Sequence, residues 1–254
     1  MLHKGRRAAS FFTPQAQLLF AEMTTSPTFD RMVVINTFIR SLIYGGIWDK
    51  LDLLYVLAAA NEQAALLNWV TPGAYTLSKT GSPTFNADTN FKPTSGGQYL
   101  GTAWDPVNEG VNFTTNSAHY SLYSTTNQYA DSSNCIVFGN SSVNLRNGSI
   151  SKMGVSLNNV GVFTSGSLST TIGHFMFNRE SASSYTIHQN DSLFETETIT
   201  AVNPTSTDLQ ILQMTGVTAN RRGMSFVSIG GGLTTTQATA FYDAFEVYRA
   251  SLGF

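Results

Sequence analysis

"SAHYSLYSTT", residues 117–126, is the clearest of a series of segments in which apolar and polar side chains alternate. Strict alternation places every second side chain on the same face, as in a β-strand that turns one face toward a core. The first set is Ala118, Tyr120 and Leu122, and the residues between them are His119, Ser121 and Tyr123. We expect the first set to face the core and the second set to face outward.

Short β-prone runs of this kind fill the chain from residue 71 to about residue 230, separated by Gly, Asn, Ser and Pro. Between "YTIHQ" and "LFETETIT", Asn190-Asp191 has the residue types of a tight hairpin turn. Because no helical pattern interrupts these runs, they predict a mainly β fold, a jelly-roll-like sandwich rather than an alternating α/β sheet.

Both ends of the chain have helical patterns. Thr13-Pro14 and Thr28 are typical helix starts, and they predict helices over about 14–23 and from residue 29 to the glycines at 45–46. The stretch 45–69, "GGIWDKLDLLYVLAAANEQAALLNW", has apolar residues at three- and four-residue steps and is predicted to be an amphipathic helix. A capping-box spacing predicts a last helix over 234–252. We therefore expect a helical N-terminal segment, 1–70, followed by a sandwich with a C-terminal helix, 71–254.

The composition excludes several classes of protein. The net charge is −2 and the only basic cluster is "HKGRR" at residues 3–7, so we expect no nucleic-acid partner. The longest uninterrupted apolar run, 53–60, is far shorter than the roughly 20 residues of a membrane-spanning helix. Pro14 follows the first short apolar stretch, so we also expect no signal peptide.

Metal and cofactor sites have no motif in this sequence. The single cysteine excludes a disulfide framework and a multi-cysteine metal site. The four histidines are widely separated, with no pair at metal-ligand spacing. We expect no cofactor and no metal, although a calcium ion bound by scattered loop oxygens stays open because such a site has no fixed spacing.

Glu195 and Glu197 in "FETETIT" are the candidate catalytic residues of an enzyme. Two residues apart on a strand, they share a face at a separation of roughly 6–7 Å, from a rise of ~3.3 Å per residue. Retaining glycosidases use carboxyl groups about 5–5.5 Å apart. Sandwich glucanases carry a third acid in a Glu-x-Asp-x-x-Glu-like run, and here Ile199 or Thr200 takes that place. The pattern favours solvent-facing acids over a catalytic pair.

Aromatic side chains in the predicted strands and loops have the flat apolar faces that stack on sugar rings. Aromatic residues in sandwiches belong to the core more often than to a ligand site. The candidate ligand-binding residues are Trp104, His119, Tyr123 and Tyr129.

The order of segments resembles a family of tailed-bacteriophage and prophage virion proteins. The resemblance extends over about residues 12–253 and rests on "FTPQAQLLFAEM", the stretch 45–69, "YLGTAWDP", "SAHYSLYSTTN", "FNRESASSYTIHQNDSL" and "SIGGGLTTTQATAFYDAFEVYRASLG". It implies a helical N-terminal segment before a concanavalin A-like, laminin-G-like sandwich. It also implies a place on the virion, as a subunit of a fibre or spike or as a decoration protein.

From this resemblance we expect residues 1–70 to dock on other virion proteins or on further copies of the chain. The sandwich would then face outward and bind polysaccharide on the host surface. Two alternatives remain: a polysaccharide-degrading enzyme centred on Glu195 and Glu197, and a purely architectural subunit without a ligand.

Overall fold

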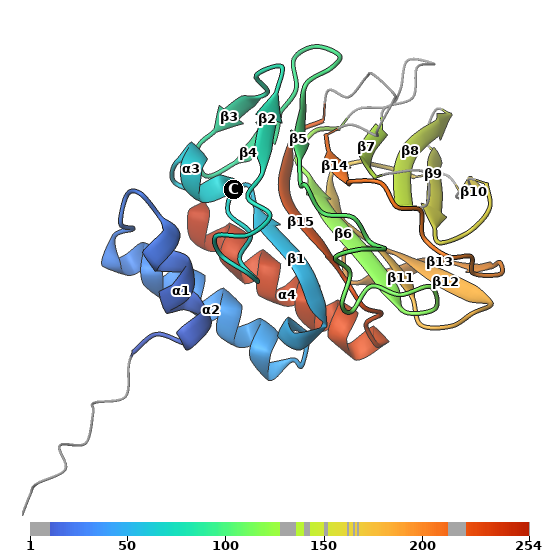
Figure 1. Cartoon of the computed structure of the whole chain (residues 1–254), viewed down its shortest axis with the longest axis horizontal. Coiled ribbons are helices and arrows are strands. Elements are labelled where there is room, and N and C mark those ends of the chain that lie inside the picture. The colour runs from blue at the N-terminus through green and yellow to red at the C-terminus, as the bar shows by residue number, and fades with distance from the viewer. Residues whose placement is uncertain are drawn as a thin grey trace, which may run out of the picture.

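Two antiparallel β-sheets form the body of the protein, and helices cover the outer face of one of them (Figure 1). The computed structural model describes residues 11–127, 136–139, 143–149, 152–161, 163–164, 166, 168–212 and 222–253. The first sheet has the strand order β13-β12-β11-β6-β15-β4-β3, with β1 also paired to β15. Its strands are β1 (Leu51–Val56), β3 (Thr84–Asn86), β4 (Asn90–Lys92), β6 (Ala118–Ser124), β11 (Gly173–Arg179), β12 (Ser184–Gln189), β13 (Ser192–Thr198) and β15 (Met224–Gly230).

The second sheet has the order β10-β9-β8-β7-β14-β5-β2. Its strands are β2 (Ser78–Thr80), β5 (Tyr99–Gly101), β7 (Ile136–Gly139), β8 (Val143–Ser149), β9 (Lys152–Leu157), β10 (Phe163–Thr164) and β14 (Gln210–Ile211). The prediction of a mainly β sandwich with helices at both ends is confirmed.

The predicted helices at the two ends are present with their caps. They are α1 (Pro14–Glu22), α2 (Phe29–Tyr44) and α4 (Thr235–Leu252). Thr13 and Thr28 accept hydrogen bonds from the first turns of α1 and α2, and Thr234 and Gln237 form the capping box of α4. Among the described residues, no helix has both the length and the apolar character needed to cross a membrane.

The stretch 45–69 is not the predicted amphipathic helix. It forms a 3-10 turn, η1 (Trp48–Lys50), then strand β1, and then one short helix, α3 (Glu62–Ala65). β1 pairs antiparallel with β15, and all but one of its residues are buried. A run that is apolar on both faces does not distinguish a buried strand from a buried helix, and here the strand forms. The N-terminal segment therefore contributes a strand to the first sheet.

Strand β6, quoted at the start, lies in the middle of the first sheet between β11 and β15. Tyr120, on the face turned toward the second sheet, stacks on Phe177 with ring centroids 4.6 Å apart. The opposite face of β6 is buried as well, because α4 lies across it (Figure 1). There Tyr123 contacts Phe245 of α4, with centroids 5.4 Å apart. The alternation therefore divides the two faces as expected, with Tyr120 toward the core, but the face of His119, Ser121 and Tyr123 is covered by α4 and is not open to solvent.

Helix α2 lies beside α4 and extends this helical layer (Figure 1). The ring of Phe38 meets those of Phe245 and Tyr248, at 6.1 and 5.4 Å between centroids. The centre of the first sheet thus has one face under helices and the other toward the second sheet, and its strand order ends at β13 and β3.

Candidate functional site

The aromatic residues predicted to stack on sugars do not form a surface platform. Trp104 is 1% exposed and packs edge-on against Phe113, with centroids 6.1 Å apart. His119 is fully buried, and Tyr123 is buried below the guanidinium of Arg249. Tyr129 lies outside the described residues. Because Trp104, His119 and Tyr123 are buried, the structure gives no support to the prediction that they contact a ligand.

His119 instead connects β6 to the start of the C-terminal segment. Its Nδ1 lies 2.6 Å from the carbonyl oxygen of Gly231, and its Nε2 lies 3.1 Å from the Ser228 hydroxyl. Burial lowers the pKa of His119 to about 4, which keeps the ring neutral at physiological pH. The residue holds the fold together and has no open side for a substrate.

An open groove of about 310 Å³ lies at the tip of the β12–β13 hairpin. We call it the hairpin groove, and it is lined by Ser169, Thr170, Gln189, Asn190, Asp191, Ser192, Leu193 and Phe194. Hydroxyl, amide and carboxylate side chains thus surround a space beside two apolar side chains. A few polar groups next to apolar surface are the chemistry with which proteins hold small polar ligands such as sugars.

The backbone of this hairpin is held in one conformation. Asn190 has a φ of +57°, as the predicted two-residue turn requires. Its backbone N–H donates to the carbonyl oxygen of His174 at 2.8 Å, and its Oδ1 accepts from the His174 N–H at 3.1 Å. Gln189 Nε2 donates to the carbonyl oxygen of Thr170 at 3.3 Å, which joins the two sides of the groove.

Leu193 gives the hairpin groove an exposed apolar surface. Its side chain is 57% exposed, although it lies at the start of a strand. Phe194 beside it is half-buried and packs on the core. The faces of sugar rings carry C–H groups that bind to such apolar surface while the ring hydroxyls meet polar partners. The sequence predicted the turn at 190–191 but not the groove, because the second wall comes from residues 169–170.

The two candidate catalytic acids lie on the inner face of the edge strand β13. Glu195 is opposite Ile187 and Glu197 is opposite Tyr185, and both of these partners are buried. Directly opposite residues of an antiparallel pair share a face, so the two acids turn toward the sandwich interior. The interpretation of both as solvent-facing acids is therefore wrong, and each is half-buried.

The contacts of Glu195 and Glu197 contribute in part to the structure of the sandwich. Glu195 Oε2 accepts a hydrogen bond from the backbone N–H of Gly166 at 3.0 Å, which fixes the adjoining loop. Burial, with the neighbouring charge of Glu195, raises the pKa of Glu197. Burial also raises the pKa of Tyr185, whose ring lies against the Arg179 guanidinium.

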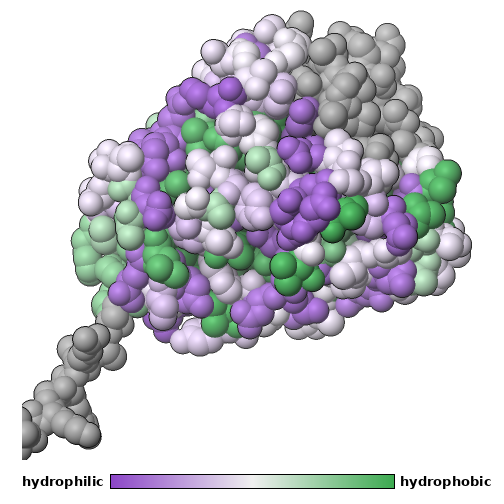
Figure 2. All heavy atoms as spheres, viewed as in Figure 1, coloured by the Kyte–Doolittle hydropathy of each residue, from purple (hydrophilic) through white to green (hydrophobic). Residues whose placement is uncertain are grey.

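Within the described ranges, no group of three or more His, Cys, Asp and Glu side chains could hold a metal ion. Figure 2 shows one face of the surface, on which hydrophobic residues form separate groups between hydrophilic ones. This face has no single large apolar area, and recognition there would combine polar and apolar contacts.

No protein family matches this sequence, and no curated protein matches it. Solved structures do match its fold. A Trypanosoma rangeli sialidase bound to a difluoro-KDN sugar is 9% identical with a TM-score of 0.59, covering 85% of this chain and 40% of that one. The botulinum neurotoxin DC binding domain, in complex with SialylT, is 11% identical with a TM-score of 0.58, covering 78% and 51%.

The botulinum neurotoxin serotype D binding domain is similar in the same way, with 13% identity and a TM-score of 0.55. The chain spans about half the length of these toxin domains and less of the sialidase. At such low identity the similarity shows the fold alone. The protein thus shares the β-sandwich fold of these structures.

Proposed function

We propose that this protein recognises carbohydrate and that the glycan binds in the hairpin groove. The observation that carries the proposal is the groove itself, where polar side chains surround the exposed Leu193 at a rigid turn. Recognition of a ligand without catalysis requires only such a surface, provided that it is already formed before the ligand binds. Of the residues first considered for this role, Trp104, His119 and Tyr123 are buried, whereas the hairpin groove is open.

The fold neighbours support a carbohydrate ligand. One toxin binding domain is described in complex with SialylT, and another belongs to a toxin whose cell entry depends on two ganglioside molecules. These are properties of those proteins, and they support the same class of ligand here through a shared fold. A glycan on a host cell surface is the ligand that we propose.

We also propose that the protein is displayed on a bacteriophage particle and attaches through its N-terminal helices. Support comes from the sequence resemblance and from the apolar side chains that α1, α2 and Phe11, three residues before α1, expose. Phe11 is 65% and Phe29 is 61% exposed, and their rings lie 5.7 Å apart. Large exposed aromatic groups mark a surface that another protein covers.

The experiment for glycan recognition is a glycan array probed with the full chain. We expect the wild type to bind a defined set of glycans and the double variant Asp191→Ala/Leu193→Ala to lose at least tenfold in affinity. Both side chains are exposed, so their removal leaves the fold unchanged. Val111→Ala, at an exposed position outside the groove, is the control and should bind as the wild type does.

Two results would overturn the proposal. If the wild type binds no glycan, the protein is an architectural subunit or acts on another ligand. If it binds glycan and the double variant binds equally well, the site lies elsewhere on the sandwich.

A further inference from the structure

A second cavity, separate from the hairpin groove, lies where the N-terminal helices meet α3 and α4. Its volume is about 340 Å³, which is within the range of small-molecule sites. We call it the Arg31 cavity. Its apolar wall comprises Met23, Ile35, Ala59, Ala64, Trp69 and Tyr248. No residue of this wall belongs to the hairpin groove, and the two sites are independent.

The walls of the Arg31 cavity are fixed by hydrogen bonds and ring contacts. Gln63 Nε2 donates to the carbonyl oxygen of Glu22 at 2.9 Å, and its Oε1 accepts from the Thr24 N–H at 3.0 Å. These bonds join α3 to the loop that follows α1. The Trp69 ring meets Phe38 and Tyr248 edge-on, each at 6.0 Å between centroids. The cavity is therefore formed before any ligand binds.

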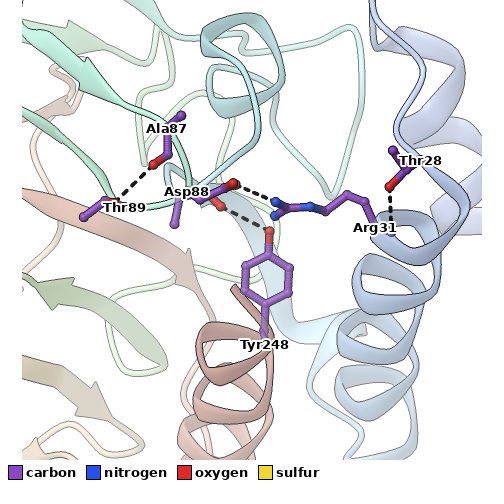
Figure 3. Close-up of polar contacts among 7 residues, drawn as sticks. Thr28, Arg31, Ala87, Asp88, Thr89 and Tyr248 are labelled. Carbon is purple, nitrogen blue, oxygen red and sulfur yellow. Dashed lines mark hydrogen bonds and ion pairs between the residues drawn. The ribbon is translucent and has the colours of Figure 1, made fainter. Parts of the chain in front are cut away.

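Arg31 brings a charged group to this apolar cavity. Figure 3 shows its side chain reaching from α2 toward Asp88, in the turn between β3 and β4, and toward Tyr248 of α4. Its Nη2 donates to Asp88 Oδ1 at 2.6 Å. The Tyr248 hydroxyl donates to the carbonyl oxygen of Ala58 at 3.2 Å, and burial raises the pKa of Tyr248 to about 12, so it stays protonated.

Two buried N–H groups of cavity-lining residues have no acceptor. Within the described part of the chain, neither Arg31 Nη1 nor Trp69 Nε1 meets the geometry of a hydrogen bond, although Arg31 lies close enough to the Tyr248 hydroxyl to oppose the rise in its pKa. Trp69 is 1% exposed. A buried donor without an acceptor is destabilising, and native proteins leave few of them. A ligand oxygen placed in the cavity would supply the missing acceptor.

The Arg31–Asp88 ion pair favours an uncharged oxygen on the ligand over a carboxylate. The Arg31 guanidinium is already neutralised by Asp88, so a carboxylate on the ligand would meet the Asp88 carboxylate without a free positive charge. An uncharged oxygen avoids this repulsion. We propose that the Arg31 cavity binds a small uncharged molecule. Its apolar part packs against the apolar wall, and its carbonyl-type oxygen accepts hydrogen bonds from Arg31 and Trp69.

The test uses three probes of similar size: acetophenone with a neutral oxygen, ethylbenzene without one, and benzoate with a negative charge. Each is titrated into ¹⁵N-labelled full-length protein, and the indole N–H signals of Trp48, Trp69 and Trp104 are followed by NMR. We expect acetophenone to shift the Trp69 signal and to leave the other two in place. We expect ethylbenzene and benzoate to bind at least fivefold more weakly, the loss that corresponds to about one hydrogen bond.

Two variants locate the binding. Arg31→Met removes the donor and should weaken acetophenone binding about fivefold. Arg40→Met, on the exposed side of the same helix, is the control and should not change it. Ala64→Met fills the cavity and should abolish the Trp69 shift. The proposal is overturned if Trp69 does not respond to acetophenone, if ethylbenzene binds as tightly, if benzoate binds more tightly, or if Arg31→Met binds like the wild type.

Discussion

Acid should destabilise this protein through histidines buried between the first sheet and α4. Burial, with nearby His188 and His119, lowers the pKa of His174 to about 3, and burial lowers that of His119 to about 4. In the unfolded chain both return to about 6.5. Between these values the unfolded state binds protons that the folded state does not, so stability falls as the pH falls below 6.5.

The size of the effect follows from these pKa values. Between pH 7 and pH 5 each ring whose folded pKa is 4 or lower costs about 2 kcal/mol, or about 4 kcal/mol for the pair. His188 also makes the folded protein less stable as the pH falls, since burial lowers its pKa too. Asp52 makes the folded protein more stable as the pH falls, because burial raises its pKa. A single variant isolates one ring from these other groups.

His174→Phe is that variant. The ring lies among Phe226, Phe241 and Tyr242, and neither of its nitrogens has a hydrogen-bond partner among the described residues. The substitution therefore removes a titrating group, and the interaction that it loses is the one with the Asn190 backbone, which raises the pKa of the ring. We expect urea unfolding, followed by circular dichroism at pH 7 and pH 5, to show that the variant loses about 2 kcal/mol less than the wild type.

The control is Met176→Leu, a buried position on the same strand without a titrating group. It should lose as much stability at pH 5 as the wild type does. If His174→Phe also loses as much as the wild type, the account of His174 as a buried neutral ring is refuted.

Three further predictions follow from the packing around the sheet. Asn178→Ala should lower the free energy of unfolding by about 2–4 kcal/mol in a urea titration, because Asn178 bonds both the N–H and the carbonyl oxygen of Leu233, at 2.7 and 2.6 Å. Deleting residues 1–66 should prevent folding, since it removes β1 from beside β15; a soluble fragment with a native circular dichroism spectrum would contradict this. Phe11→Ser/Phe29→Ser should leave the melting temperature within a few degrees of the wild type but reduce incorporation into particles, and normal incorporation would exclude these residues from docking.

The sequence was sufficient to predict the elements that local signals define. Thr13, Thr28 and Thr234 determine where three helices begin, and Asn190 supplies the positive φ of the hairpin turn. The alternation in β6 predicted a strand, but the pattern does not say what covers its polar face. Here the cover is α4, which lies more than a hundred residues away in the sequence.

Other features depend on contacts between distant segments, and no local pattern contains them. β1 is a strand because β15 is available to pair with its apolar run. The Arg31 cavity requires Arg31 to meet Asp88, 57 positions later, and Tyr248 of the last helix. Aromatic residue type alone does not separate a core ring such as Trp104 from a ligand platform, because only packing decides exposure.

The most direct test of glycan recognition is an NMR map of the bound ligand. A glycan identified on the array would be titrated into ¹⁵N-labelled protein, and the backbone signals that shift would be assigned. We predict that the shifted signals cluster at residues 169–170 and 189–194, around the hairpin groove. Shifts centred on any other part of the surface, with these residues unchanged, would contradict the account.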